Sequence, residues 1–256
     1  MERLIHLPIS NELKKEFGGQ SITYRFLQRL SLDCLEKCYD FCGDTMPGDA
    51  TAPGTLEIKQ NASGTATILA DQLNGVCQID TVGTTANDYC FLSVPELPCK
   101  GDLYSVVAVR LSGVSTVANT KIEVGFSDAT TNAGIVNALA TPTFNATDGV
   151  CWIYDTNDTA YWQMAGVKDG SAATKIEPEL HAPAAGTYQT LVIALEGTFA
   201  KFYLLNADHE LLYESTLMDA VTASTQLSPW VGVQTRAAAA RKINVDYIAF
   251  WQYRDT

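Results

Sequence analysis

The chain has 256 residues, of which 46% are hydrophobic and 18% are charged, so it can form a sizeable core and is not an intrinsically disordered chain. Its 17 basic and 29 acidic side chains give a net charge of −12, which repels phosphate groups and argues against nucleic acid and anionic membrane surfaces as partners. No apolar stretch is long enough to span a membrane, and the N-terminus lacks an export-signal pattern, so we expect synthesis and retention in the cytoplasm.

The first 45 residues predict an arm outside the main domain. Residues 21–42 are expected to form an amphipathic helix, because Ser21 is a suitable N-cap and Gly43 stands where helices commonly end. Apolar and thiol side chains at helical spacing would form one stripe on it, which comprises Phe26, Leu27, Leu30, Cys34, Cys38 and Phe41. We expect this stripe to pack on the chain's own β-domain or to bind a partner chain. Residues 46–54, rich in Gly, Pro and Asp, predict a linker.

The remainder of the chain, 55–256, predicts strands and no helix. Short runs of alternating polarity are separated by turn residues, which is the pattern of half-buried strands. The thirteen expected strands are 55–60, 65–70, 75–82, 89–94, 102–112, 120–128, 149–156, 160–168, 187–197, 199–207, 210–215, 229–235 and 242–253. So many short strands in one domain predict an all-β fold, an antiparallel sandwich of two sheets.

The last expected strand, 242–253, is apolar at almost every second position although it lies close to the chain terminus. One face is expected to carry Ile243, Val245, Tyr247, Ala249 and Trp251, and the other Ile248, Phe250 and Gln252. An exposed edge strand of this composition would be an aggregation site. We therefore expect this strand to be held between two neighbours in a sheet.

The order of strands and aromatic residues over 100–256 resembles that of concanavalin-like (laminin-G-like) jelly rolls, in particular accessory structural proteins of tailed-bacteriophage virions. The resemblance is carried by the aromatic strand pair DGVCWIYDTNDTAYWQM and by the closing sequence DYIAFWQ at 246–252, and it extends loosely over 55–100. It implies a jelly-roll sandwich and a non-enzymatic capsid decoration or cement protein on the virion surface. The implied partner is the major capsid protein or another virion protein, bound by a homo-oligomer, with a trimer favoured. No cofactor is implied.

Catalysis finds little support in the sequence. The three histidines, His6, His181 and His209, are not placed for a Ser-His-Asp arrangement. The E-x-D-x-x-E strand typical of glycosidases with the resembled fold is absent, and the proline between Glu177 and Glu179 predicts a loop or edge there. We therefore expect no enzyme and no catalytic residues.

Two acidic turns and the cysteines are the candidates for metal binding. The turns hold Asp155, Asn157 and Asp158, and Asn206, Asp208 and Glu210. Oxygen ligands of this kind suit Ca²⁺, but the same residues are typical of ordinary turns, and we predict no metal site. The seven cysteines form no CxxC pair and are expected to be reduced and mostly buried, with a metal site or an intermolecular disulfide as alternatives.

The alternative function is that of a carbohydrate-binding module or lectin. Trp152, Tyr154, Tyr161 and Trp162 lie on two strands that flank the turn at 155–158. Aromatic rings can stack on sugar rings, so these residues are candidates for binding surface glycans. The competing interpretation is that they pack in the core.

Overall fold

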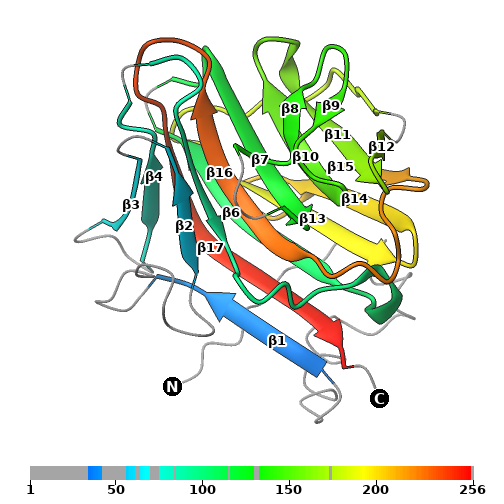
Figure 1. Cartoon of the computed structure of the whole chain (residues 1–256). Coiled ribbons are helices and arrows are strands. Elements are labelled where there is room, and N and C mark those ends of the chain that lie inside the picture. The colour runs from blue at the N-terminus through cyan, green and yellow to red at the C-terminus, as the bar shows by residue number, and fades with distance from the viewer. Residues whose placement is uncertain are drawn as a thin grey trace.

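The computed structural model describes residues 34–41, 56–61, 64–69, 75–83, 85–114, 116–129, 133–172 and 175–254. They form two antiparallel sheets packed face to face (Figure 1), so the predicted all-β sandwich is confirmed. The described residues contain no helix that is long and apolar enough to cross a bilayer.

The eight-stranded sheet has the order β15-β14-β13-β6-β17-β4-β3, and β1 also pairs with β17. Its strands are β1 (Cys34–Tyr39), β3 (Thr65–Ile68), β4 (Cys77–Asp80), β6 (Val106–Gly113), β13 (Gln189–Glu196), β14 (Phe199–Leu205), β15 (Leu211–Leu217) and β17 (Lys242–Tyr253). A short 3-10 helix, Gly101–Leu103, precedes β6.

The seven-stranded sheet has the order β12-β11-β10-β7-β16-β5-β2. Its strands are β2 (Glu57–Gln60), β5 (Tyr89–Ser93), β7 (Thr120–Ser127), β10 (Gly149–Asp155), β11 (Thr159–Lys168), β12 (Ser171–Ala172) and β16 (Ser228–Thr235). A separate hairpin pairs β8 (Val136–Ala138) with β9 (Thr143–Phe144). All thirteen predicted strands are present within a few residues of their expected ends, whereas β1, β8, β9 and β12 were not predicted.

Two hydrophobic cores result from the alternation of side chains along these strands. The main core fills the space between the sheets, with every second residue of each central strand pointing inward. A smaller core lies on the outer face of the seven-stranded sheet, where Ile135, Val136 and Leu139 of the β8–β9 region cover Ile153 and Trp230. The hairpin therefore closes part of a face that would otherwise be exposed to water.

β17 lies between β6 on one side and β4 and β1 on the other, as expected for an apolar terminal strand. The predicted assignment of its faces is wrong, however. A β-bulge between Val245 and Tyr247 shifts the register, so Val245 and Ile248 both enter the main core and Tyr247 turns to the outer face. One extra residue in the ladder reverses the alternation after it, and the pattern of apolar residues alone does not reveal where that happens.

The helix predicted for 21–42 is wrong over Cys34–Tyr39, which is β1 and pairs antiparallel with the end of β17 (Figure 1). The edge of β17 beyond β4 offers unpaired backbone groups, and extended backbone satisfies them where a helix would not. Residues 21–33, with the stripe members Phe26, Leu27 and Leu30, lie outside the described residues.

Of the stripe members, Cys38 and Phe41 do not share a surface. Cys34 and Cys38 belong to β1, where Cys38 is exposed, while Phe41 is buried in the main core. β1 also places residues before the predicted domain start at 55 within the eight-stranded sheet.

Candidate functional site

The aromatic residues predicted as a glycan platform lie in the core. Trp152 and Trp162 are fully buried and Tyr154 is 3% exposed. Trp152 Nε1 donates to Val192 O at 3.2 Å, and Trp162 Nε1 donates to Gln189 Oε1 at 2.9 Å, so both indoles bind across the sandwich to the opposite sheet. A sugar cannot stack on these rings in the folded protein; only Tyr161, which points outward from β11, is exposed.

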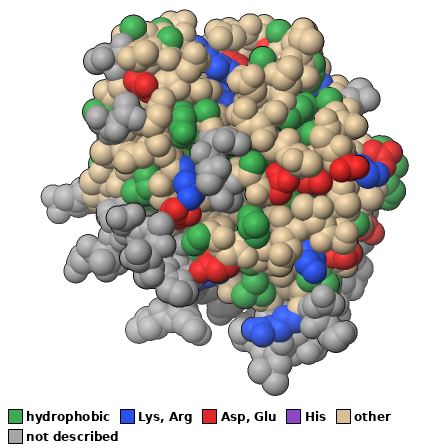
Figure 2. Space-filling view, viewed as in Figure 1, with side chains coloured by type: hydrophobic (Ala, Val, Ile, Leu, Met, Phe, Trp, Pro, Cys, Tyr) green, Lys and Arg blue, Asp and Glu red, His purple; other side chains and the backbone are tan. Residues whose placement is uncertain are grey.

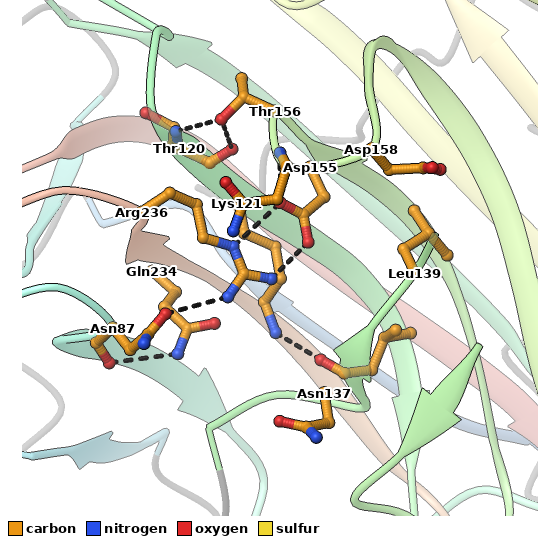
Figure 3. A network of polar contacts seen from close by, with 12 residues as sticks. Asn87, Thr120, Lys121, Asn137, Leu139, Asp155, Thr156, Asp158, Gln234 and Arg236 are labelled. Carbon is orange, nitrogen blue, oxygen red and sulfur yellow. Dashed lines mark hydrogen bonds and ion pairs between the residues drawn. The ribbon is translucent and has the colours of Figure 1, made fainter. Parts of the chain in front are cut away.

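Polar side chains instead gather at one end of the outer face of the seven-stranded sheet. Gln234, Lys121 and Asp155 are cross-strand neighbours on β16, β7 and β10. We call this group the polar strip; it comprises Asn87, Lys121, Asp155, Asp158, Gln163, Lys175, Gln234 and Arg236. Figure 3 shows the part around Arg236. Figure 2 shows basic and acidic side chains together in a notch at the upper edge of the molecule, over the ends of β7 and β16.

Arg236 is the centre of the strip. Its Nε donates to Asp155 Oδ1 at 2.9 Å, its Nη2 donates to Asp155 Oδ2, and its Nη1 donates to Asn87 Oδ1 at 3.1 Å. Asn87 has a left-handed φ of 73°, which asparagine tolerates in turns better than most residues, and its carbonyl accepts from Gln234 Nε2 at 3.1 Å. The planar guanidinium thus forms a bidentate pair with the carboxylate of Asp155 and also binds Asn87. It connects the end of β10 with the turn before β5.

Lys121, a member of the strip, forms an ion pair of 2.9 Å with Glu123, and both side chains are fully buried. Lys121 Nζ also donates to Ala133 O at 3.0 Å and to Val136 O at 2.5 Å. Glu123 accepts from the backbone N–H groups of Ile135 at 2.7 Å and Val136 at 3.1 Å. Two alternate residues of β7 therefore satisfy the backbone of the segment that leads into the β8–β9 hairpin, which is why buried charges are tolerated here.

Asp158 forms the other end of the strip. Its Oδ2 accepts from Lys175 Nζ at 2.7 Å and from Gln163 Nε2 at 3.0 Å, and Lys175 also donates to Leu139 O at 3.2 Å. Burial by itself raises the pKa of Asp158, but the bonds from Lys175 and Gln163 outweigh burial and lower it. Asp158 is therefore an ionised acceptor at neutral pH.

Two carboxamide oxygens in the strip have no hydrogen-bond partner although they are buried, namely Gln163 Oε1 and Gln234 Oε1. The exposed Asn87 lies next to Gln234, and Asn137 in β8 is exposed in the same region of the molecule (Figure 3). The strip thus contains buried acceptors that have no hydrogen-bond partner, and it also contains amides that face solvent. It can therefore form hydrogen bonds with a polar ligand.

The acidic turns considered for Ca²⁺ are built as ordinary turns. Asp155 Oδ1 accepts from the N–H of Asn157 at 3.1 Å, and Asn206 Oδ1 accepts from the N–H groups of Asp208 and Glu210 at 3.0 and 2.8 Å. Among the described residues, no group of three or more His, Cys, Asp or Glu side chains is arranged to hold a metal ion.

Four described cysteines are buried and form no disulfide, namely Cys77, Cys90, Cys99 and Cys151. Burial raises the pKa of Cys77, Cys90 and Cys99 to about 12, so these thiols stay protonated and unreactive.

No protein-family model matches the chain, and no curated protein matches it in sequence. Solved structures do match its fold. A protein of unknown function from Shewanella oneidensis MR-1 has a TM-score of 0.64 at 17% identity, over 100% of this chain and 99% of that one. Peanut lectin in complex with a 9-residue peptide has a TM-score of 0.56 at 8% identity, over 88% and 100%. The CBM2 module of the evolved Dit of Lactobacillus casei BL23 phage J-1 has a TM-score of 0.54 at 13% identity, over 88% and 98%.

The chain has the concanavalin-like fold of the legume lectins. The resemblance inferred from its strands and aromatic residues is confirmed at the level of the fold. One of the structures with this fold is a module of a phage protein.

The polar strip itself was not predicted. Its members are spread from Asn87 to Arg236, and only Asp155 and Asp158 had been considered, for a different role. One signal was present in the sequence. Lys121 and Glu123 place two charges on one face of a strand whose other face is apolar, and this pattern predicts polar contacts on the charged face.

Proposed function

We propose that this chain is a non-enzymatic, lectin-type protein that binds a neutral saccharide at the polar strip. The observation that carries the proposal is that each end of the strip has a buried acceptor without a partner, Gln234 Oε1 beside Asn87 and Gln163 Oε1 beside Asp158. Saccharide hydroxyls donate and accept hydrogen bonds at once, so they suit a site that offers carboxamide oxygens and amide or guanidinium N–H groups together. The lectin fold of the neighbours supports the same ligand class.

The charges of the strip support binding rather than catalysis. Each of its carboxylates has a basic partner, Asp155 with Arg236 and Asp158 with Lys175. The pKa of Asp158 is lowered, which is the wrong direction for a general acid that must carry a proton at neutral pH.

Gln234→Met tests the proposal, because it keeps the size of the side chain and removes the carboxamide. We expect a glycan array to give binding for the unmodified chain and at least about tenfold weaker binding for the variant. Gln78→Met is the matched control: Gln78 also donates a side-chain hydrogen bond, to Asn244 Oδ1 at 3.1 Å, but from β4 in the other sheet. An array without signal, or equal binding by both variants, would refute the proposal.

A second candidate function is that of a structural protein on a bacteriophage capsid, which binds the major capsid protein. Two observations favour it: one fold neighbour is a module of a phage protein, and an uncharged row of Val192, Ala108 and Ala249 crosses the outer face of the eight-stranded sheet. Small apolar side chains in adjacent strands present a flat surface that suits a protein partner.

Mass spectrometry of purified particles and heat inactivation of shells with and without the protein test this candidate. Particles that lack the protein, and shells whose resistance does not change, would refute it. Native mass spectrometry of the purified chain tests the expected trimer.

A further inference from the structure

A second group of polar side chains lies on the opposite outer face of the sandwich, at the bulge in β17. Thr190, Arg110 and Tyr247 are cross-strand neighbours on β13, β6 and β17. Asp246, at the bulge, accepts a hydrogen bond from Arg110 Nη1 at 2.6 Å. We call these residues, with Tyr188 and His209, the bulge cluster; none of them belongs to the polar strip.

Tyr188 and His209 form the rim of the bulge cluster. The ring centre of Tyr188 lies 4.4 Å from Arg110 Cζ, so the guanidinium stacks on the phenol. His209 is in the turn between β14 and β15. Burial lowers its pKa, the charge of Arg110 lowers it further, and Asp246 and Asp208 oppose these effects without cancelling them. The imidazole is therefore neutral at pH 7 and has one nitrogen that can accept a hydrogen bond.

Two polar atoms of the bulge cluster are buried without a hydrogen-bond partner, Arg110 Nε and His209 Nδ1, and the hydroxyls of Thr190 and Tyr247 interact with each other. Thr190 is fully buried and Tyr247 is 9% exposed, while the side chains of Arg110 and Asp246 are 19% and 18% exposed. The cluster thus has a buried floor and a rim that reaches solvent. Buried polar groups without partners destabilise a protein, so two of them in one place, next to two hydroxyls that contact each other, point to a ligand that engages them.

We propose that the bulge cluster is a second binding site, and that its ligand is a neutral saccharide. The two hydroxyls of Thr190 and Tyr247 can donate or accept, Arg110 Nε donates, and His209 can do either, which matches the mixed requirements of sugar hydroxyls. An anion would meet Asp246 and Asp208 as well as a chain of net charge −12, and a cation would meet Arg110. A neutral polyol is the class that none of these charges repels.

The two proposed sites lie on opposite outer faces, one on each sheet. A chain that binds sugars at both could hold two glycans at once, which raises the avidity for a glycan-coated surface without stronger contacts at either site. The bulge site does not depend on the polar strip being a binding site, because the two share no residue.

Titration of the ¹⁵N-labelled full chain with methyl glycosides of glucose, galactose and mannose, followed by amide chemical shifts, tests the bulge site, with glucuronic acid as the anionic probe. We expect shifts in β6, β13 and β17 around Arg110 and Tyr247. Tyr247→Phe and Thr190→Val each remove one hydroxyl and should weaken binding about three- to tenfold. Any loss of melting temperature should be small, because the two hydroxyls contact only each other in the free protein.

Thr216→Val, at an exposed position on the same face, is the matched control and should bind like the unmodified chain. Gln234→Met should leave the shifts around the bulge unchanged, so failure of the polar strip is distinguishable from failure of this site. Three results would overturn the proposal: no shifts at the bulge with any neutral glycoside, stronger binding of glucuronic acid, or variants that lose stability and keep full affinity.

Discussion

Replacing Glu123 by glutamine tests how much the buried ion pair contributes to the hairpin over the seven-stranded sheet. The carboxylate is fully buried and accepts from two backbone N–H groups, those of Ile135 and Val136, and from Lys121 Nζ at 2.9 Å. Glutamine has the same shape, but it offers one oxygen and one NH₂ group. Its NH₂ must therefore face either a backbone N–H or the ammonium, and Lys121 loses its counter-charge inside the protein.

The expected loss is a large share of the stability of the fold. Removing one partner of a buried ion pair costs about 3–5 kcal/mol, against a total of about 5–15 kcal/mol for a typical domain. Lys121 retains two backbone acceptors, Ala133 O at 3.0 Å and Val136 O at 2.5 Å, so we expect a value near the lower limit, about 3 kcal/mol.

Urea denaturation measures the global effect, and amide hydrogen exchange at Ile135 and Val136 measures the local one. Both amides should exchange faster in the variant, because the bonds that protect them are weakened. Glu214→Gln, at an exposed position of β15, is the control and should change stability by less than about 0.5 kcal/mol. If Glu123→Gln is equally harmless and the two amides stay protected, the ion pair does not hold the hairpin.

Gly134→Ala perturbs the same contact, between Glu123 and the segment that leads into the β8–β9 hairpin. Gly134 has a φ of 97°, and a Cβ at this position would lie 2.3 Å from Glu123 Oε2. The alanine must therefore both adopt a strained backbone and displace the carboxylate. We expect a loss of stability and faster exchange at Ile135, as for Glu123→Gln; a variant as stable as the unmodified chain would contradict the described packing.

Two further predictions concern residues that the sequence had suggested for other roles. Trp152→Ala and Trp162→Ala should each cost about 3–5 kcal/mol in thermal or urea denaturation, because both indoles are fully buried, while glycan affinity per folded molecule stays unchanged; lost binding with normal stability would restore them as a glycan platform. For His209, the folded pKa lies below the unfolded value of 6.5, so the folded state binds the proton less readily and the free energy of unfolding should fall as the pH drops below 6.5. His209→Asn should flatten this decrease in urea titrations, because asparagine does not titrate and tolerates the φ of 63°. An unchanged slope would show that burial and the charge of Arg110 do not lower the pKa of His209 as described.

The sequence alone was enough to identify the all-β class and the position of every long strand. A strand with one face in a core and one face elsewhere must alternate, and its ends need turn residues, so both signals are local and survive in the printed letters. The placement of β17 between neighbours also followed from its sequence, because so apolar a strand cannot remain an unpaired edge.

Only the tertiary structure decided which strand edges, faces and side chains meet. Cys34–Tyr39 is a strand because the far edge of β17 is open to it, and Tyr247 faces outward because of a bulge that its neighbours in β6 define. Trp152 is in the core because the opposite sheet covers it, and Arg236 binds Asp155 although 81 residues of chain separate them. Local periodicity sets what each segment can become, whereas pairing, burial and polar contacts depend on partners that lie far away in the chain.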